Sequence, residues 1–283
     1  MSATLTIARL VLLEASRRRL LLALAGLTLA VIAVIGYGMY QLPKLAPNET
    51  RDDVLQAAAF LQMFAFFMFS FVLTFAAVFV AAPSLAADLD SGVMLAIAPR
   101  PIRRSEIVIG RWLGLIALVG GYTIAATGLE MLVVWMVLGY SQPDALRPLF
   151  FLVLEGVVAV TFGLLLSTRL APMTGGIVAT IMLLVVWFAG IVGALGIAFG
   201  NNTVSTIGTV ARLLLPTDGS WRGALYYLQP ASFIELGAAL GRRAYFNPFY
   251  EGNPPPLPYL VWIAAWIAGV LGLTIFSFRK REL

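Results

Sequence analysis

The chain has 283 residues, of which 60% are hydrophobic and only 12% are charged. This composition excludes an ordinary water-soluble globule and predicts an integral membrane protein. The net charge of +5 does not require a nucleic acid as partner, because basic inner loops and anionic lipid headgroups account for it.

Cysteine and histidine are both absent from the sequence. Thiolate and imidazole metal sites, haem ligation through either group, and Ser-His or Cys-His catalysis are therefore excluded. No HExxH, GxSxG or glycine-rich phosphate loop occurs, and every aspartate lies in a flank or loop. We expect a chain that is not itself an enzyme and binds no cofactor or metal. If ATP powers it, another polypeptide binds the ATP and Mg²⁺.

Residues 1–19 predict a short amphipathic helix that lies in the inner headgroup layer. Leu5, Ile7 and Val11 fall near one helical face, while Arg9 makes the other face more polar. The alternative is that this stretch is only the flank of the first span. A cleavable signal peptide fits less well, because the apolar run that follows is long and ends without a small-residue cleavage site.

Six apolar runs are long enough to cross the bilayer, since ~30 Å of hydrocarbon takes ~20 apolar residues per helix. The fourth run is the weakest because it is short and contains Glu155. We expect an all-α membrane protein with one transmembrane domain over residues 1–283. The expected spans are Leu20–Leu42, Val54–Ala82, Gly110–Gly139, Leu149–Leu166, Ile177–Phe199 and Pro258–Phe278.

Lysine and arginine collect on one side of these spans, which sets the orientation. Twelve of the 19 basic residues precede span one, lie between spans two and three, follow span four or follow span six. This side is predicted to be cytoplasmic, so both termini lie inside a plasma or inner membrane. The twelve are Arg9, Arg17, Arg18, Arg19, Arg100, Arg103, Arg104, Arg111, Arg169, Arg279, Lys280 and Arg281.

Two spans have a distinctive composition. Span two is rich in phenylalanine and contains Met63 and Met68, which indicates either an adaptable contact surface for an apolar substrate or an ordinary surface for lipid and packing. Glycines at helical spacing in span five favour the close approach of another helix, unless they reflect only the frequency of glycine in membrane helices. These are Gly190, Gly193, Gly196 and Gly200.

Residues 200–257 form an external loop region that is too long for a hairpin connection. Its alternating apolar and polar pieces predict two or three short amphipathic helices at the outer interface. The run Pro254–Pro256 predicts a stiff extended lead into span six. Aromatic residues suited to the interface are Trp221, Tyr226, Tyr227, Tyr245 and Tyr250.

Glu130 and Glu155 are the carboxylates that fall well inside expected spans, where ionisable residues are candidates for function. They could bind a cationic headgroup, relay protons along a substrate or proton path, or pair with Arg147 or a loop arginine. The structural alternative is a polar pair that holds spans three and four together.

The stretch from Pro83 to Arg111 interrupts the apolar pattern between spans two and three. Pro83 is expected to end span two, and Asp88 and Asp90 can then stabilise the start of a short helix. Residues 92–98 are apolar enough to lie against another protein before two prolines end the run. The alternative is an ordinary cytoplasmic hairpin, which would not need this apolar insert.

The order of residues here resembles the permease subunits of type-two ABC exporters. In that family an acidic residue, a glycine, an apolar run and Pro-x-x-Arg-x-Glu precede three apolar residues, a glycine and a lysine. This chain has aspartate for the usual glutamate, Val93 where threonine is common, and arginine for the lysine. The matching residues are Asp88, Gly92, Pro101, Arg104, Glu106, Ile107, Val108, Ile109, Gly110 and Arg111.

The resemblance implies a homodimeric permease that sits on two copies of a separate ABC ATPase, which holds the ATP and Mg²⁺. Residues 83–106 would be the cytoplasmic coupling segment, with a coupling helix from Ser84 to Ala98. The family also allows an external accessory protein as partner. The residues implied for ATPase docking are Asp88, Asp90, Gly92, Val93, Leu95, Ile97, Arg103 and Arg104.

We therefore expect the transmembrane subunit of an ATP-driven exporter whose substrate the sequence does not identify. A proton- or ion-coupled carrier that uses Glu130 and Glu155 is one alternative, and loss of transport on replacing both by glutamine would favour it. A non-transporting membrane scaffold is the other, and unaltered substrate flux in a deletion strain would favour it.

Overall fold

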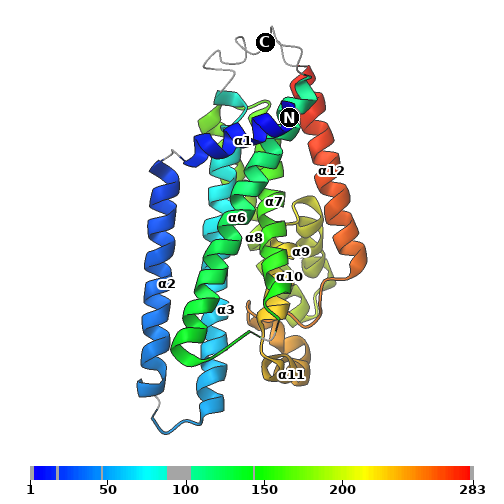
Figure 1. Ribbon diagram of the computed structural model, residues 1–283. Helices are drawn as coiled ribbons and strands as arrows, with labels where there is room; N and C mark the ends of the chain where they lie inside the picture. The colour runs from blue at the N-terminus through cyan, green and yellow to red at the C-terminus, as the bar shows by residue number, and fades with distance from the viewer. Residues whose placement is uncertain (1–2, 17–18, 46, 88–102, 143, 281–283) are drawn as a thin grey trace.

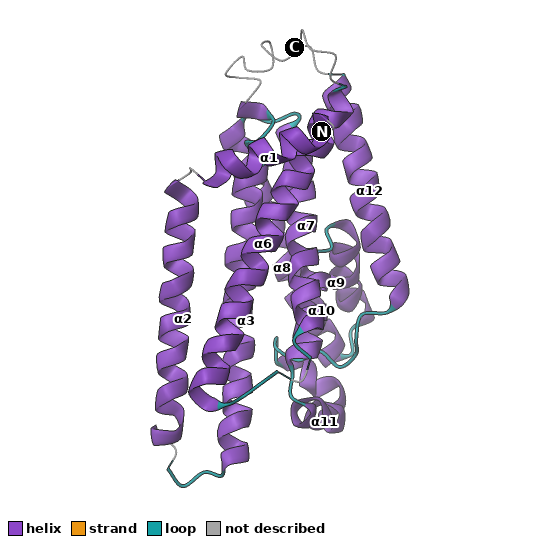
Figure 2. Ribbon diagram, in the orientation of Figure 1, coloured by secondary structure: helices purple, strands orange, loops and turns teal. Residues whose placement is uncertain are grey.

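The computed structural model describes residues 3–16, 19–45, 47–87, 103–142 and 144–280. Within these ranges the chain is helical, with no strand (Figure 2). The coupling helix expected from Ser84 to Ala98 is therefore described only as far as Ala87. The implied docking residues that lie outside the described residues are Asp88, Asp90, Gly92, Val93, Leu95 and Ile97.

Six helices among the described residues are long and apolar enough to cross a membrane. They confirm the six expected spans. Span three differs most from its expected bounds, because it begins at Arg104 rather than at Gly110. The carboxylate of Glu106 accepts a 2.8 Å hydrogen bond from the backbone N–H of Arg103 and so caps the first turn. The six are α2 (Arg19–Leu45), α3 (Arg51–Ala81), α6 (Arg104–Leu138), α7 (Leu146–Ser167), α8 (Pro172–Phe199) and α12 (Leu257–Arg279).

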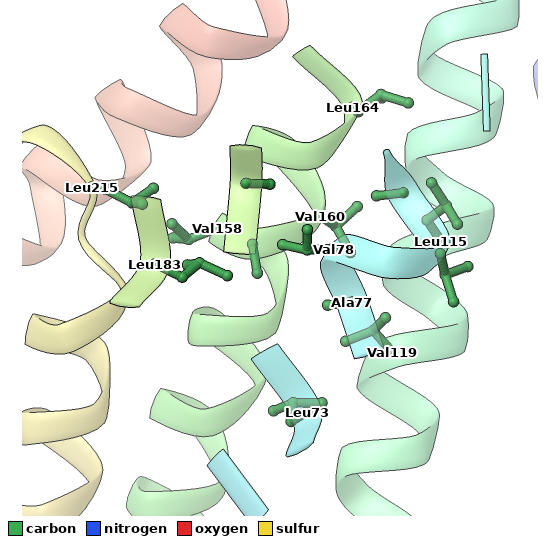
Figure 3. Packing of buried hydrophobic residues seen from close by; sticks show 14 of the residues in the cluster. Leu73, Ala77, Val78, Leu115, Val119, Val158, Val160, Leu164, Leu183 and Leu215 are labelled. Atoms are coloured by element: carbon green, nitrogen blue, oxygen red, sulfur yellow. The ribbon is translucent and has the colours of Figure 1, made fainter. Parts of the chain in front are cut away.

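Helix α7 lies at the centre of the bundle, in contact with α3, α6, α8 and α12. Helix α2 stands at one edge and α12 at the other (Figure 1). Buried aliphatic side chains such as Leu73, Leu115, Val158 and Leu183 fill the space between the central helices (Figure 3). Because lipid tails are as apolar as these side chains, close packing rather than removal from water holds the spans together.

Helix α1 (Ala3–Ser16) packs against the first turns of α6, at the end of the bundle where α12 also finishes (Figure 1). We call this the terminal end. A Cβ on Gly110 would lie 2.8 Å from the backbone oxygen of Thr4, and one on Gly114 would lie 2.8 Å from that of Ala8. The contact thus needs glycine at both positions. The N-terminal helix is confirmed, and its place in the headgroup layer stays a prediction.

Four short helices connect α8 to α12 at and near the other end of the bundle, which we call the loop end (Figure 1). Helix α9 turns back along α8 after Gly200, which has φ 71°. A Cβ on Gly193 would lie 2.7 Å from the Cα of Gly208, so the glycine face of span five serves an approach of backbone to backbone within the chain. The four are α9 (Asn202–Leu214), α10 (Thr217–Leu228), α11 (Ala231–Leu240) and the 3₁₀ helix η1 (Gly241–Phe246).

Helix α10 differs from the expectation of helices that lie at the outer interface. It packs against α7, α8 and α3, and every residue from Thr217 to Leu225 is buried. Trp221 and Tyr250, which were expected in an interfacial aromatic belt, are each only 5% exposed. The short helices exist as predicted, but the second is part of the protein interior.

The end of α9 is completed by α12. The last backbone carbonyls of α9 accept hydrogen bonds from three α12 side chains that lie about one turn apart. Tyr259 donates to the carbonyl of Arg212 at 3.2 Å, and Trp262 and Trp266 donate to those of Leu213 and Leu214 at 3.1 and 2.8 Å. These carbonyls have no partner within their own helix, so α9 depends on α12 for its C-terminal cap.

Candidate functional site

The described residues on either side of segment 88–102 are tied to different helices at the terminal end. On the first side, the Ser167 hydroxyl at the end of α7 accepts hydrogen bonds from the backbone N–H groups of Leu85 and Ala86, at 2.9 and 3.1 Å. Leu85 is fully buried. The chain that enters the segment is therefore fixed to the central helix.

On the second side, Arg104 donates from Nη1 to the carbonyls of Phe278 and Arg279, at 3.3 and 2.8 Å. A guanidinium suits these groups because the last carbonyls of a helix lack partners within it and carry partial negative charge. Arg104 was implied to contact an ATPase, and that role stays a prediction. The chain that leaves the segment is thus fixed to α12.

A further polar contact joins α7 to α12 at the same level. The Ser277 hydroxyl lies 2.8 Å from that of Thr168 and accepts a 2.8 Å hydrogen bond from Nε of Arg169. The described flanks of segment 88–102 are thus hydrogen-bonded to the ends of α7 and α12, and these two helix ends are hydrogen-bonded to each other.

Glu155 is 4% exposed and faces α3. Its carboxylate accepts hydrogen bonds from the Ser70 hydroxyl at 2.8 and 2.9 Å and from the Thr74 hydroxyl at 2.9 Å. Hydroxyl donors on successive turns of α3 therefore satisfy this carboxylate inside the bundle.

Glu130 is fully buried on α6 and faces Gln62 of α3. Neither of its carboxylate oxygens has a hydrogen-bond partner of suitable geometry among the described residues. The two glutamates therefore do not join spans three and four as a pair, since each faces span two. Nor does either pair with Arg147, which forms a 3.0 Å ion pair with Asp144.

The phenylalanines of span two divide between two surroundings. Phe67 and Phe71 pack against Trp187 of α8, with ring centroids 6.1 and 4.9 Å apart. Phe60 and Phe64 have 42% and 45% of their surface exposed. Phe71 lines a cavity of about 30 Å³ whose other lining residues include Ser70, Thr74, Glu155, Trp187, Asp218 and Trp221.

Four charged side chains at the loop end form an alternating chain that the sequence did not predict. Nε of Arg212 lies 2.8 Å from Oδ2 of Asp218, and Nε of Arg222 lies 3.1 Å from the same oxygen. Nη1 of Arg222 lies 3.2 Å from Oε2 of Glu251, and its Nη2 donates to the carbonyl of Gly190 at 3.1 Å. We call these four residues the charge chain.

The charge chain is held inside the protein. Arg222 and Asp218 are 5% and 4% exposed. Burial lowers the pKa of the Arg222 guanidinium, but the carboxylates of Asp218 and Glu251 outweigh burial and raise it above its ordinary value. Gln229 fixes Glu251 in place, because its amide bonds both the N–H and the carbonyl of that residue at 3.1 and 2.9 Å.

A second, larger cavity of about 300 Å³ opens beside the charge chain. It lies between α9, α10 and the proline run that leads into α12. Its lining includes Thr209, Arg212, Arg222, Glu251, Asn253 and Tyr259.

Among the described residues, no group of three or more metal-ligating side chains could hold a metal ion. The family model described as "ABC-2 family transporter protein" matches residues 5–283. No curated protein matches the chain.

Proposed function

The chain belongs to the ABC-2 transporter family, and from that premise we propose that it is the permease subunit of an ATP-driven exporter. A separate ABC ATPase supplies the nucleotide site, since the sequence has no glycine-rich phosphate loop. The match over residues 5–283 is the observation that carries this proposal. The chain acts with a second copy of itself, and both termini face the ATPase in the cytoplasm.

The anchoring of segment 88–102 supports a mechanical role for it. ATP binding closes the ATPase pair, and a segment docked on the ATPase moves with it. Ser167 and Arg104 pass that movement to α7 and α12 through the hydrogen bonds at the two flanks. The terminal ends of four spans then shift as one unit, which opens or closes a path for the substrate.

The docking surface in this proposal is the apolar run around Leu95 with its acidic and basic edges. Val93, Leu95 and Ile97 would fill an apolar groove on the ATPase, while Asp88 and Arg103 would form ion pairs at the rim. An aspartate at Leu95 would be buried without a partner in that groove, so it should prevent docking.

Co-purification of the tagged chain with an ABC ATPase from the same genome tests the proposal. The native chain should retain the ATPase, and Leu95→Asp should lose it while the chain still reaches the membrane. Glu235→Gln, an exposed change on α11, is the matched control and should retain the ATPase. Replacing Asp88 and Gly92 should abolish ATP-driven transport.

Transport by this chain alone would overturn the proposal. If replacing Glu130 and Glu155 with glutamine abolished flux while ATPase removal had no effect, a proton- or ion-coupled carrier would be established instead. Uptake of the substrate into inside-out vesicles on addition of ATP is the result expected for an exporter.

A further inference from the structure

The charge chain has two unequal ends, and both ends line the same cavity. Asp218 and Arg222 in its middle each contact two oppositely charged side chains. Arg212 and Glu251 at its ends each contact one. The cationic end and the anionic end therefore face one space of about 300 Å³.

The hydrogen-bonding groups at these two ends are only partly used. Arg212 donates from Nε to Asp218, and its Nη1 and Nη2 have no partner among the described residues. Glu251 accepts from Arg222 at Oε2, and its Oε1 has no hydrogen-bond partner in that part of the chain. A guanidinium has five N–H donors and a carboxylate has two acceptor oxygens, so each end has capacity left for a ligand.

We propose that this cavity binds a zwitterionic group in which an anionic oxyacid is joined to a primary ammonium, as in phosphoethanolamine. The oxyacid contacts the two Nη atoms of Arg212, which match the fork of a phosphate or carboxylate. The ammonium donates to Oε1 of Glu251. The ligand thus joins the two ends and turns an open chain of four charges into a closed, alternating ring.

Charge balance favours a zwitterion over a simple anion or cation. The charge chain is neutral as a whole, since two arginines face two carboxylates. A lone anion at Arg212 would give the neutral site a net negative charge and be repelled by Glu251, and a lone cation at Glu251 would give it a net positive charge and be repelled by Arg212. A zwitterion satisfies both ends and leaves the site neutral.

The size and the rigid walls of the cavity also favour a small headgroup. Its volume lies at the lower limit of ligand pockets, ~300–1,000 Å³, so a drug-sized molecule would fill or exceed it. Gln229 bonds the backbone of Glu251 and Arg222 bonds its carboxylate, while Asp218 bonds the guanidinium of Arg212, so both recognition groups are positioned before binding. Pre-organised groups lose little entropy when the ligand binds.

A phosphatidylethanolamine lipid and a free small zwitterion both carry this ligand group. Thermal unfolding of the full chain, purified in detergent and delipidated, distinguishes the two. The probes are phosphatidylethanolamine, phosphatidylglycerol and soluble O-phosphoethanolamine. Phosphatidylethanolamine should raise the apparent Tm by about 2–4 °C relative to phosphatidylglycerol. Stabilisation by the soluble probe as well would indicate a headgroup site, and stabilisation by the lipid alone would indicate that the acyl chains are needed.

Variants at both ends of the charge chain and at one lining residue of the cavity test whether the Tm difference between the two lipids arises in this cavity. Arg212→Gln and Glu251→Gln should each abolish the difference between the two lipids. Thr209→Trp keeps all four charges and fills the cavity from α9, so it should abolish the difference without lowering the Tm in phosphatidylglycerol. Arg243→Gln and Glu235→Gln are exposed matched controls on η1 and α11, and should keep the difference.

Three outcomes would overturn the proposal. Equal stabilisation by phosphatidylglycerol and phosphatidylethanolamine would show that the ammonium is not recognised. A difference that persists in Thr209→Trp would place the site elsewhere. Absence of any shift with both zwitterionic probes would show that the cavity binds neither.

Discussion

The terminal end and the loop end are held together by different physical means. At the terminal end, α1 approaches α6 so closely that two glycines leave no room for a Cβ. At the loop end, α10 is buried with charges that contact one another and a backbone carbonyl. The α1–α6 contact depends on the short distance between the two helices, and the burial of α10 depends on the pairing of opposite charges. Adding a Cβ should therefore disrupt the α1–α6 contact, and removing one charge should disrupt the packing of α10.

Removal of Asp218 should have the largest effect, because it leaves two arginines without their shared partner. Asp218→Asn is expected to cost ~3–5 kcal/mol of stability, the usual result of breaking a buried ion pair at one side. Thermal or denaturant unfolding of the purified chain measures it. Asp144→Asn removes an ion pair in which Arg147 is 64% exposed, and should cost under ~1 kcal/mol. Similar losses in both variants would contradict the buried charge chain.

Addition of a methyl group at Gly114 should have the next largest effect. A Cβ there would lie 2.7 Å from the Cβ of Val11, so Gly114→Ala should force α1 away from α6 at a cost of ~1–3 kcal/mol. Gly121→Ala on the same helix meets nothing within 4 Å and is the control. Since the chain has no cysteine, a cysteine pair introduced between α1 and α6 would report the separation by loss of cross-linking. Undiminished cross-linking in Gly114→Ala would contradict the close contact.

Glu155→Gln should lower the stability by ~1–2 kcal/mol, less than the upper values expected for Asp218→Asn and Gly114→Ala. One accepting oxygen becomes an NH₂ donor that faces the hydroxyl donors of α3. Ser70 and Thr74 can rotate to accept in part, which limits the loss. Unfolding of the purified variant measures the cost. The double variant Ser70→Ala and Glu155→Gln should lose less than the sum of the single changes, and strict additivity would argue against the hydrogen bonds.

Glu130→Met should have the smallest effect of the series, within ~1.5 kcal/mol in either direction. The side chain is fully buried and its oxygens have no hydrogen bond of suitable geometry to lose among the described residues. The same unfolding measurement applies. A loss above ~3 kcal/mol would show that Glu130 has a partner as important as those of Glu155.

The sequence predicted the spans well because lipid imposes a length and an apolar composition on each helix. Local residues such as Glu106 then adjust an end by capping it. The burial of helix α10 was not predicted because Asp218, Ser220 and Arg222 look polar in isolation. Their burial depends on Gly190 and Glu251, which are distant in sequence, and no local pattern encodes such a meeting. The available signal was an aspartate and an arginine four residues apart, each followed by a glycine.

The two glutamates show the same limit at the candidate site. Their position inside spans could be predicted, but the α3 residues that they face could not, because Ser70, Thr74 and Gln62 are ordinary residues in a run of phenylalanines. The docking role of segment 88–102 stays a prediction from its residue order.

The cap that α12 provides for α9 sets an order for biosynthesis. The ribosome synthesises α12 after the hairpin of α8 and α9. The last three carbonyls of α9 therefore lack their hydrogen-bond donors until α12 has been inserted and packed against α9. A nascent chain that stops before Tyr259 would leave these three carbonyls without their α12 donors, and wherever lipid covers such a group the missing hydrogen bond costs several kcal/mol. Cellular quality control could thus recognise an unfinished chain by a defect located far from its broken end.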